Sequence, residues 1–491
     1  MNLSSLIAAD VPRTKPAIIF AEEGQPAKTI SYASFIDELT ACAAALADQG
    51  VKRGSFVGIL AANHPQYFCA FYALLQLGAV ACPLNWQLDD QSTKALAELI
   101  PLDFVLHDAP RSRVAESLAT ALSMDHLIGQ AGPAGRAADL GSDDLAAIMF
   151  TSGSSGLPKG VPLTHGGYIW ALESFDWFRP AAREARSLIA APYFHMNAQC
   201  SVMISLFLGG TVVLMPRFTP ELWLDTIESC RVTELTGVPS MMAMMLETMD
   251  RGYRRDVSSV NLISLGSAPL SSHLLARIQA AMPGADVADG YGTTETGFAG
   301  FGPHPGALET PRGSIGYPSA DVACRLESGP SVDEGELWLQ TPMTTAGYWK
   351  RPDLTEPKRV GDWWRTGDLM RRDANGFYYF VGRADDMFVC GGENLYPGDI
   401  EARLERHPDV EQAAVVPVAH DIKGQAPVAF VVPRAGASLT EDAVRTFALD
   451  NGPAYAHPRR VWVLDALPLS AAGKRDKNQL AEMAQRNVET A

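Results

Sequence analysis

Short apolar runs alternate with helical patterns along most of this chain, and this alternation constrains the fold more than any other feature. Residues 56–60 form an apolar run of strand length, 67–77 carry a helical pattern, and 79–82 form the next apolar run. The same rhythm returns at 211–214 and at 262–265. Strand–helix–strand alternation predicts an α/β fold of βα-layered subdomains with mainly parallel sheets.

The length of the chain requires more than one domain. Its 491 residues exceed what one hydrophobic core usually holds, since domains typically run about 100–200 residues. The last hundred residues change character, because charged helical stretches such as 399–407 alternate with short β patterns such as 413–416 and 427–432. This change predicts a small α+β domain that begins near residue 383.

Charge and composition exclude several classes of function. With 40 Lys and Arg against 56 Asp and Glu, the formal net charge is −16, which disfavours a general binder of nucleic acid or of anionic membranes. The seven cysteines are scattered and odd in number, as is typical of reduced thiols. No apolar run approaches the length of about 20 residues that spans a bilayer. We therefore expect a cytoplasmic globular protein without a membrane span.

A loop rich in serine and glycine follows the apolar segment 146–150. Glycines let a backbone approach a ligand closely, and hydroxyl and amide groups donate to phosphate oxygens. Such a composition alone is typical of a flexible loop, and the G-K-[ST] ending of a Walker A loop is absent. The preceding strand and a lysine held between proline and glycine favour a phosphate-binding loop, after which Thr164 is predicted to cap a helix. The candidate loop residues are Thr151, Ser152, Gly153, Ser154, Ser155, Gly156 and Lys159.

Five motifs, in one order, relate the chain to a known family. TSGSSGLPKG at 151–160 resembles the nucleotide loop of the adenylate-forming superfamily, which includes acyl-CoA synthetases, adenylation domains and luciferases. Four further segments resemble later motifs of that family. They are YGTTE at 291–295, WRTGDL at 364–369, GRADD at 382–386 with GGENLYP at 391–397, and PLSAAGK at 468–474. On these motifs the chain is identified as a member of the superfamily.

The resemblance implies carboxylate activation. A carboxylic acid attacks the α-phosphate of ATP to give an acyl-adenylate and pyrophosphate, and a thiol then displaces AMP. ATP, Mg²⁺ and coenzyme A are therefore the implied cofactors and co-substrates. The family's architecture implies a large domain over 1–382 with the ATP and acyl sites, a hinge over 383–387 that includes Asp385, and a small mobile C-terminal lid over 388–491 with a catalytic lysine.

The motifs also imply roles for single residues. Glu295 is the expected Mg²⁺ ligand, since a hard cation that bridges phosphates prefers oxygen ligands, and Thr294 is expected beside the α-phosphate. Asp368, as an acceptor-only carboxylate, suits two ribose hydroxyls. Lys474 would neutralise charge between the carboxylate and the α-phosphate, although AAGK departs from the commoner TGK form. The other implied ATP or AMP contacts are Ser267, Ala268, Pro269, Tyr291, Gly292, Thr293 and Arg383.

The acyl and CoA sites are predicted from shorter sequence motifs. PYFHMNA at 192–198 resembles the segment that borders the carboxylate in CoA ligases, which makes His195 a candidate catalytic residue. The Met-rich segment 241–245 is either ordinary helix core or an adaptable apolar pocket. The acyl-pocket candidates are Tyr193, Phe194, Met241, Gly290, Phe298 and Ala299. The CoA candidates are Gly391, Gly392, Lys423 and Arg459, of which the two cations are alternatively solvated surface charges.

Together these features predict an AMP-forming carboxylate–CoA ligase. Its expected substrate is an aromatic or hydroxycinnamic acid, or else a medium-chain aliphatic acid. The alternatives are a stand-alone adenylation enzyme that loads an acyl carrier protein, and a non-catalytic nucleotide-binding paralogue. Retention of Lys159, Glu295, Asp368 and Lys474 argues against the paralogue. The sequence leaves a homodimer open.

Overall fold

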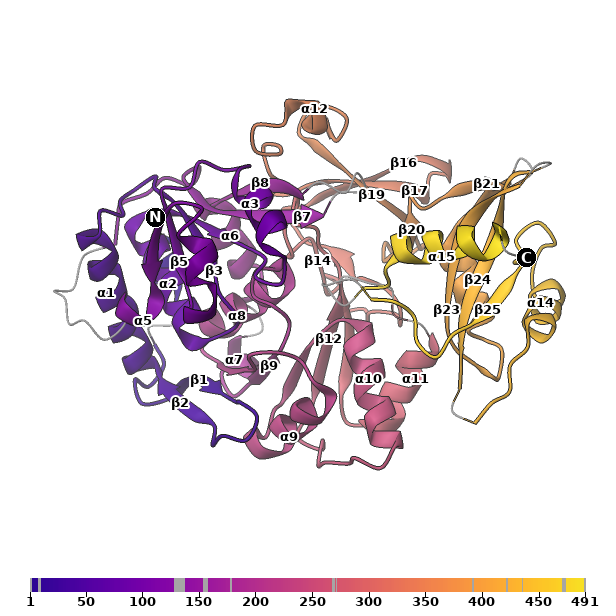
Figure 1. The fold of residues 1–491 in the computed structure, drawn as a ribbon, viewed down its shortest axis with the longest axis horizontal. Helices are drawn as coiled ribbons and strands as arrows, with labels where there is room; N and C mark the ends of the chain where they lie inside the picture. Colours follow the sequence, from indigo (N-terminus) through magenta and orange to yellow (C-terminus); the bar gives the residue numbers. More distant parts are fainter. Residues whose placement is uncertain are drawn as a thin grey trace.

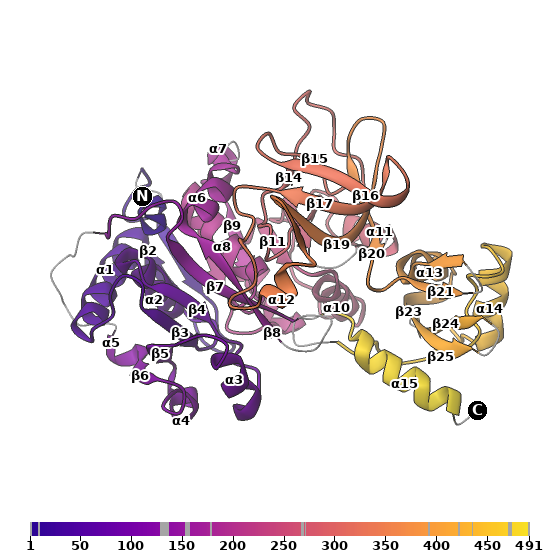
Figure 2. The same ribbon diagram turned by 90° about the horizontal axis from the view of Figure 1, so that it is seen from above.

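A computed structural model of the chain describes residues 2–7, 10–127, 137–152, 158–176, 179–266, 270, 272–390, 393–420, 423–434, 436–469 and 474–489. The N-terminal part forms a large body, and the C-terminal part, yellow in Figures 1 and 2, lies at the opposite end of the molecule from the N-terminus.

Two sheets of mainly parallel strands form the centre of the large body. The first has the order β13-β12-β11-β9-β10-β1-β2, in which only β1 and β2 pair antiparallel. The second has the order β6-β5-β3-β4-β7-β8, in which only β7 and β8 pair antiparallel. The strands are β1 (Pro16–Phe20), β2 (Lys28–Ser31), β3 (Phe56–Leu60), β4 (Val80–Pro83), β5 (Phe104–His107), β6 (Thr120–Ser123), β7 (Leu145–Ser152), β8 (Pro158–Thr164), β9 (Arg186–Ile189), β10 (Thr211–Leu214), β11 (Glu234–Gly237), β12 (Leu262–Gly266) and β13 (Asp286–Gly290).

Helices bury both faces of the seven-stranded sheet because successive strand residues point to opposite sides. On one side, α1, α2, α6 and α8 share a core with strands of both sheets. On the other side, α9, α10 and α11 pack on residues such as Leu235 and Ile263. Thr164 caps α6 as predicted, since its Oγ1 accepts from Gly167 N–H at 3.1 Å. The helices are α1 (Tyr32–Asp48), α2 (Pro65–Leu77), α3 (Asp90–Ala97), α4 (Ser112–Ala115), α5 (Met124–Leu127), α6 (His165–Glu173), α7 (Arg179–Ala182), α8 (Met196–Leu208), α9 (Pro220–Cys230), α10 (Pro239–Asp250), α11 (Ser272–Ala281) and α12 (Pro352–Thr355), with 3₁₀ turns at Leu3–Leu6 and Ala109–Arg111.

A third, antiparallel sheet joins the large body to the C-terminal part. Its order is β16-β17-β19-β18, with β20 on β19, and a separate pair joins β14 to β15. The expectation of mainly parallel sheets does not extend to this region, because a strand such as β19 alternates buried with partly exposed residues and carries no apolar run. The strands are β14 (Phe301–Gly302), β15 (Tyr317–Pro318), β16 (Ala323–Ser331), β17 (Glu334–Gln340), β18 (Arg359–Val360), β19 (Trp363–Arg372) and β20 (Tyr378–Arg383).

The C-terminal part is an α+β unit with its own sheet, in which both predicted β patterns are strands and the predicted charged helix is α13. Cores of buried residues lie on either side of the sheet. The predicted α/β class with a separate C-terminal unit is therefore confirmed. Of the helices that the structure describes, none is both long and apolar enough to cross a bilayer. The elements are β21 (Phe388–Cys390), β22 (Glu393–Leu395), α13 (Pro397–Leu404), β23 (Val410–His420), β24 (Gly424–Pro433), α14 (Glu441–Asp450), β25 (Val461–Val463) and α15 (Lys477–Glu489).

Candidate active site

A cleft of about 2390 Å³ runs between the carboxyl ends of the parallel strands, the antiparallel sheet and the C-terminal part. Gly266 and Gly290, the last residues of β12 and β13, line it together with Asp368 of β19 and Lys474. Ligands of open α/β sheets bind outside the carboxyl ends of the strands, so this is the expected place for a site.

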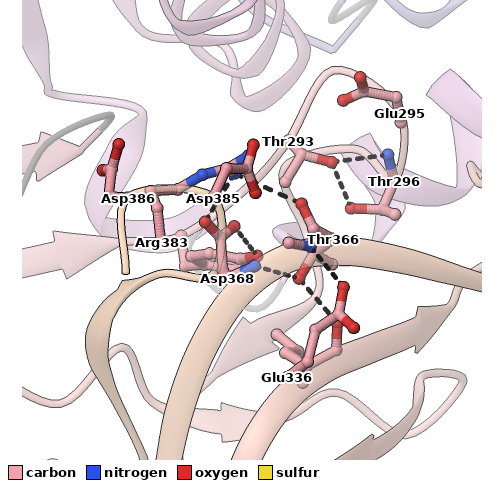
Figure 3. A network of polar contacts seen from close by, with 12 residues as sticks. Thr293, Glu295, Thr296, Glu336, Thr366, Asp368, Arg383, Asp385 and Asp386 are labelled. Carbon is pink, nitrogen blue, oxygen red and sulfur yellow. Dashed lines mark hydrogen bonds and ion pairs between the residues drawn. The ribbon is translucent and has the colours of Figure 1, made fainter. Parts of the chain in front are cut away.

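Asp368 is the centre of a polar network at the wall of the cleft (Figure 3). Its Oδ2 accepts from the Tyr291 hydroxyl at 2.6 Å, and its Oδ1 accepts from an Arg383 guanidinium N–H at 2.7 Å. Its own backbone N–H donates to Thr366 Oγ1 at 3.0 Å, and the residue is 5% exposed. Each carboxylate oxygen can accept about two hydrogen bonds and accepts one here, so Asp368 is held in place and still has lone pairs for hydroxyl groups of a ligand.

The charged and polar groups around Asp368 shift each other's pKa values so that each keeps its role as donor or acceptor. Burial alone would lower the pKa of Arg383, but the carboxylates of Asp368 and Asp385 raise it. Burial and the Asp368 carboxylate both raise the pKa of Tyr291, so its hydroxyl stays a donor. Arg383 also reaches Asp385 Oδ2 at 3.3 Å, which ties the end of β20 to the predicted hinge.

Glu295 lies in the segment after β13, and one of its carboxylate oxygens accepts a hydrogen bond. The Tyr348 hydroxyl donates to Glu295 Oε1 at 2.8 Å, and the Lys159 ammonium lies 4.9 Å from the centre of the Tyr348 ring. Glu295 Oε2 has no hydrogen-bond partner among the described residues. No cluster of three or more metal-ligating side chains occurs in the part of the chain that the structure describes. A single available carboxylate fits Mg²⁺, which is usually held by one or two carboxylates together with substrate phosphates and water.

His195 and Lys474 meet at the acyl side of the cleft. His195 precedes α8 without making a capping hydrogen bond, and its buried Nε2 has no partner among the described atoms. Burial and the nearby Lys474 ammonium lower the pKa of His195 to about 4. The protein atoms around Lys474 lower its pKa, Arg383 lowers it further and Asp368 opposes the shift, although the lysine side chain still reaches solvent in the cleft.

A neutral His195 with a buried Nε2 predicts a specific acid sensitivity. Its pKa falls from an ordinary 6.5 to about 4 on folding, so between these values the unfolded chain binds the extra proton and stability decreases as the pH falls. From pH 7 to pH 5 we expect the wild type to lose about 2 kcal/mol more of its free energy of unfolding than His195→Gln. Urea denaturation at the two pH values measures the difference, and equal losses would show that His195 is already protonated in the folded protein.

Three ion pairs anchor the residues that directly follow Lys474. Arg475 donates to Glu401 at 2.8 Å and to Glu405 at 3.0 Å, and both carboxylates are buried. Lys477, at the start of α15, donates to Asp386 Oδ2 at 2.6 Å. The chain is therefore anchored at two positions directly after the lysine that lines the cleft.

Comparison with known proteins identifies this arrangement. The AMP-binding enzyme family matches residues 7–349, and the AMP-binding enzyme C-terminal domain matches residues 399–474. The chain belongs to the AMP-binding enzyme family. It is 32% identical to a feruloyl-CoA synthase of Amycolatopsis sp over 92% of this chain and 93% of that protein. It is 30% identical to a 2-succinylbenzoate–CoA ligase of Geobacillus kaustophilus over 97% of both chains.

A solved structure has the same fold. The o-succinylbenzoate CoA synthetase of Bacillus subtilis, in complex with its acyl-adenylate intermediate, superposes with a TM-score of 0.84 at 29% identity over 98% of this chain and 97% of that one. The superfamily inferred from the five motifs is thus confirmed.

In this AMP-binding enzyme, most of the described residues that the motifs single out do line one cleft. The ATP-side and catalytic candidates that line it are Thr151, Lys159, His195, Tyr291, Gly292, Thr293, Thr294, Glu295, Asp368, Arg383, Asp385 and Lys474. The acyl-side candidates that line it are Phe194, Met241, Gly290, Phe298 and Ala299. The roles assigned to all of these residues stay predictions.

Some candidates lie outside the described residues. These are Gly153, Ser154, Ser155, Gly156, Ser267, Ala268, Pro269, Gly391 and Gly392. Ser152 is described only as the last backbone position of β7, opposite Pro158.

Tyr193 is a correction to the expected acyl pocket. Its ring is 1% exposed and packs edge-on against Tyr67 and Phe68 of α2, with centroids 4.9 and 4.5 Å away. Tyr193 and Phe194 are the central residues of a turn that the His195 N–H closes on the Pro192 carbonyl, and of the two only Phe194 lines the cleft.

The two described cationic CoA candidates do not line the cleft. Arg459 contacts His457 at 3.0 Å, and burial lowers the pKa of His457, helped by the charges of Arg459, Arg445 and Lys423. Lys423 and Arg459 therefore belong to one basic cluster on the C-terminal unit, away from the acyl side of the cleft.

Sequence reasoning missed Tyr348, which positions Glu295 from a loop 53 residues further along the chain. It also missed Glu401 and Glu405, which anchor Arg475. An aromatic residue in a loop and two acidic residues on a surface helix carry no local signal of these roles. The only local signal is Arg475, a cation directly after the motif lysine Lys474, which indicates that an acidic partner is needed.

Proposed function

We propose that this protein is an AMP-forming carboxylate–CoA ligase, which converts a carboxylic acid, ATP and coenzyme A into acyl-CoA, AMP and pyrophosphate through an acyl-adenylate. One observation carries the proposal. Lys474 of the C-terminal unit lies in the same cleft as Asp368, Glu295 and His195, at a place where its charge affects His195. Side chains that are separated by up to nearly 300 positions in the sequence thus lie together where a carboxylate and a triphosphate would meet.

The proposed reaction needs positioning and positive charge more than covalent help. Lys474 neutralises the negative charge that develops as the substrate carboxylate reaches the α-phosphate. Thr294 and Lys159 donate to the phosphates, and Asp368 and Arg383 hold the ribose. Glu295 would hold Mg²⁺, which would supply positive charge to offset that of the pyrophosphate group.

Movement of the C-terminal unit connects the two half-reactions in this proposal. The structure has Lys474 in the cleft, which suits adenylation. Rotation about the hinge 383–387 would withdraw Lys474 and bring the 391–392 segment to the cleft for thiolation. The basic cluster with Arg459 and Lys423 then supplies contacts for the phosphates of coenzyme A. Residues 1–382 and 388–491 are the two proposed moving parts.

An aromatic acid is the proposed substrate class. Phe175 and Phe298 stack at 6.2 Å with an interplanar angle of 25°, and Phe298 and Phe194 both line the cleft. The relative at 32% identity is named for the feruloyl group, an aromatic acyl group. A medium-chain aliphatic acid is the alternative, since Met241 and Met244 also line the cleft and adapt to flexible chains.

Release of AMP from Mg²⁺-ATP tests the proposal. We expect CoA-dependent AMP release with aromatic or hydroxycinnamic acids at least about tenfold above that with medium-chain acids, because rings fill a pocket lined by aromatic side chains. Each acid is measured with and without coenzyme A. Pyrophosphate exchange without any effect of coenzyme A would instead favour transfer to an acyl carrier protein, and silence with every acid would favour a non-catalytic protein.

A further inference from the structure

One part of the cleft is a slot that the proposed adenylation chemistry does not use. It lies between α8 and the face of the seven-stranded sheet that is turned away from α9, α10 and α11. Positions 197, 201, 204 and 208 of α8 follow helical spacing and so share one face of that helix. We define the α8 slot by the side chains of Asn197, Ser201, Ile204 and Leu208 on the helix and of Ser187, Glu234, Thr236 and Ser264 on the sheet, all of which line the cleft.

The two ends of the slot differ. At the mouth, Asn197 Nδ2 lies 3.7 Å from where a side chain on Gly266 would begin, so this end adjoins the proposed adenylate site. The floor lies four residues back along β12, where Leu262 pairs with Glu234 and Glu234 pairs with Ser187. At a rise of about 3.3 Å per residue, the floor is about 13 Å below the mouth. An arylpropenoic acid, with its carboxylate at the mouth, spans most of this depth.

A carboxyl group forms the floor of the slot. Ser187 Oγ donates to Glu234 Oε2 at 2.6 Å, and Ser187 is 3% exposed. Glu234 Oε1 accepts no hydrogen bond from the residues that the structure describes, and the half-buried Glu234 side chain lines the cleft. Burial raises the pKa of Glu234, which the serine hydrogen bond partly opposes. The partly desolvated carboxyl group thus keeps one oxygen, Oε1, without a partner among the described residues.

The charge at the floor favours one kind of substrate. Glu234 is the only ionisable side chain among the eight that define the slot, and Asp286, which pairs with Leu262 on the next strand and also lines the cleft, adds a second negative charge at this level of the sheet. A hydroxyl or ring N–H at the far end of an acyl group would satisfy Oε1, whereas an apolar end would leave it unsatisfied. A second carboxylate on the substrate would meet a like charge.

From this geometry we infer that Glu234 is a specificity-determining residue, which selects aromatic acids with a hydrogen-bond donor at the end far from the reacting carboxylate and rejects dicarboxylic acids. The inference rests on the proposed function, because it names the substrate class of the same site. Thr236, between the mouth and the floor, does not act in this way, since its hydroxyl already donates to the Leu188 carbonyl at 3.2 Å.

Matched acids test the role of Glu234. With 4-hydroxycinnamate and cinnamate we expect the wild type to prefer the hydroxylated acid at least about 30-fold in kcat/KM, because a site built around a hydroxyl rejects the analogue that lacks it. Glu234→Leu should reduce this preference to within about threefold. Glu234→Gln, which keeps an acceptor and the bond from Ser187, should retain part of the preference and raise kcat/KM for 4-carboxycinnamate by about tenfold.

Thr236→Val is the matched control on the same strand and face. It should change the rates with both cinnamic acids by the same factor. A wild type that does not distinguish the two acids, or a Glu234→Leu variant that loses both equally, would overturn the inference. Calorimetric binding of the two acids is measured in parallel, because it reports the preference even if no acid is turned over. Failure of ligase activity is therefore distinguishable from failure of the role of Glu234.

Discussion

Replacing Lys474 by alanine is expected to slow acyl-adenylate formation by about 10²–10³-fold, while thiolation of a supplied acyl-adenylate stays within about twofold of the wild type. The reason lies in the position of the ammonium, which is close enough to His195, Arg383 and Asp368 to shift or be shifted by their charges. In the proposed mechanism this charge is needed only while a carboxylate and a phosphate, both anionic, are forced together.

The two half-reactions are measured separately. ATP–pyrophosphate exchange reports adenylation, and release of acyl-CoA from a synthetic acyl-adenylate reports thiolation. Lys474→Arg keeps the charge and should recover part of the exchange rate, and Lys52→Ala, an exposed lysine far from the cleft, should behave as the wild type. Equal loss in both assays from Lys474→Ala would contradict the proposed division of labour between the faces of the C-terminal unit.

Glu295→Gln is expected to slow adenylation by about 10²-fold and to raise the Mg²⁺ concentration that gives half-maximal rate, because a neutral amide is a weaker ligand for a hard cation. The fold should survive, since the amide oxygen can still accept from the Tyr348 hydroxyl that lies 2.8 Å from Glu295 Oε1.

Mg²⁺ titration of pyrophosphate exchange measures this effect. Tyr348→Phe is the matched control, because it removes the hydrogen bond to Glu295 and leaves the carboxylate in place. It should lower the rate by no more than about tenfold and shift the Mg²⁺ requirement less than Glu295→Gln does. An unchanged Mg²⁺ dependence in Glu295→Gln would assign the metal to another ligand.

The motif residues of the site could be predicted because each motif is local. Residues 291–295 form one short segment after β13, and 364–369 lie within the single strand β19, so their order along the chain already specifies which groups act together. The same holds for the parallel sheets, since apolar runs of strand length report burial on both faces. The antiparallel sheet β16–β20 escaped prediction because strands such as β17 and β19 mix apolar with charged and polar residues and carry no apolar run of strand length.

Side-chain direction was the first thing that local patterns could not supply. Tyr193 and Phe194 are adjacent aromatic residues in one motif, yet one lies in the core and the other in the cleft. Which of the two faces the cleft depends on how the segment after β9 packs against α2, and that contact joins parts of the chain more than 100 residues apart.

The sequence by itself determined the family, the α/β class and the identity of the residues that meet in the cleft, because these depend on short segments whose chemistry is readable in isolation. Only the tertiary structure decided which side chains form hydrogen bonds with these residues. Asp368 accepts hydrogen bonds from Tyr291 and Arg383 because β19 pairs with β20 beside the end of β13. Glu234 accepts a hydrogen bond from Ser187 because β11 lies next to β9 in the sheet, although 47 residues separate Glu234 from Ser187 in the sequence. Strand order is set by packing of the whole core, so no local pattern carries it.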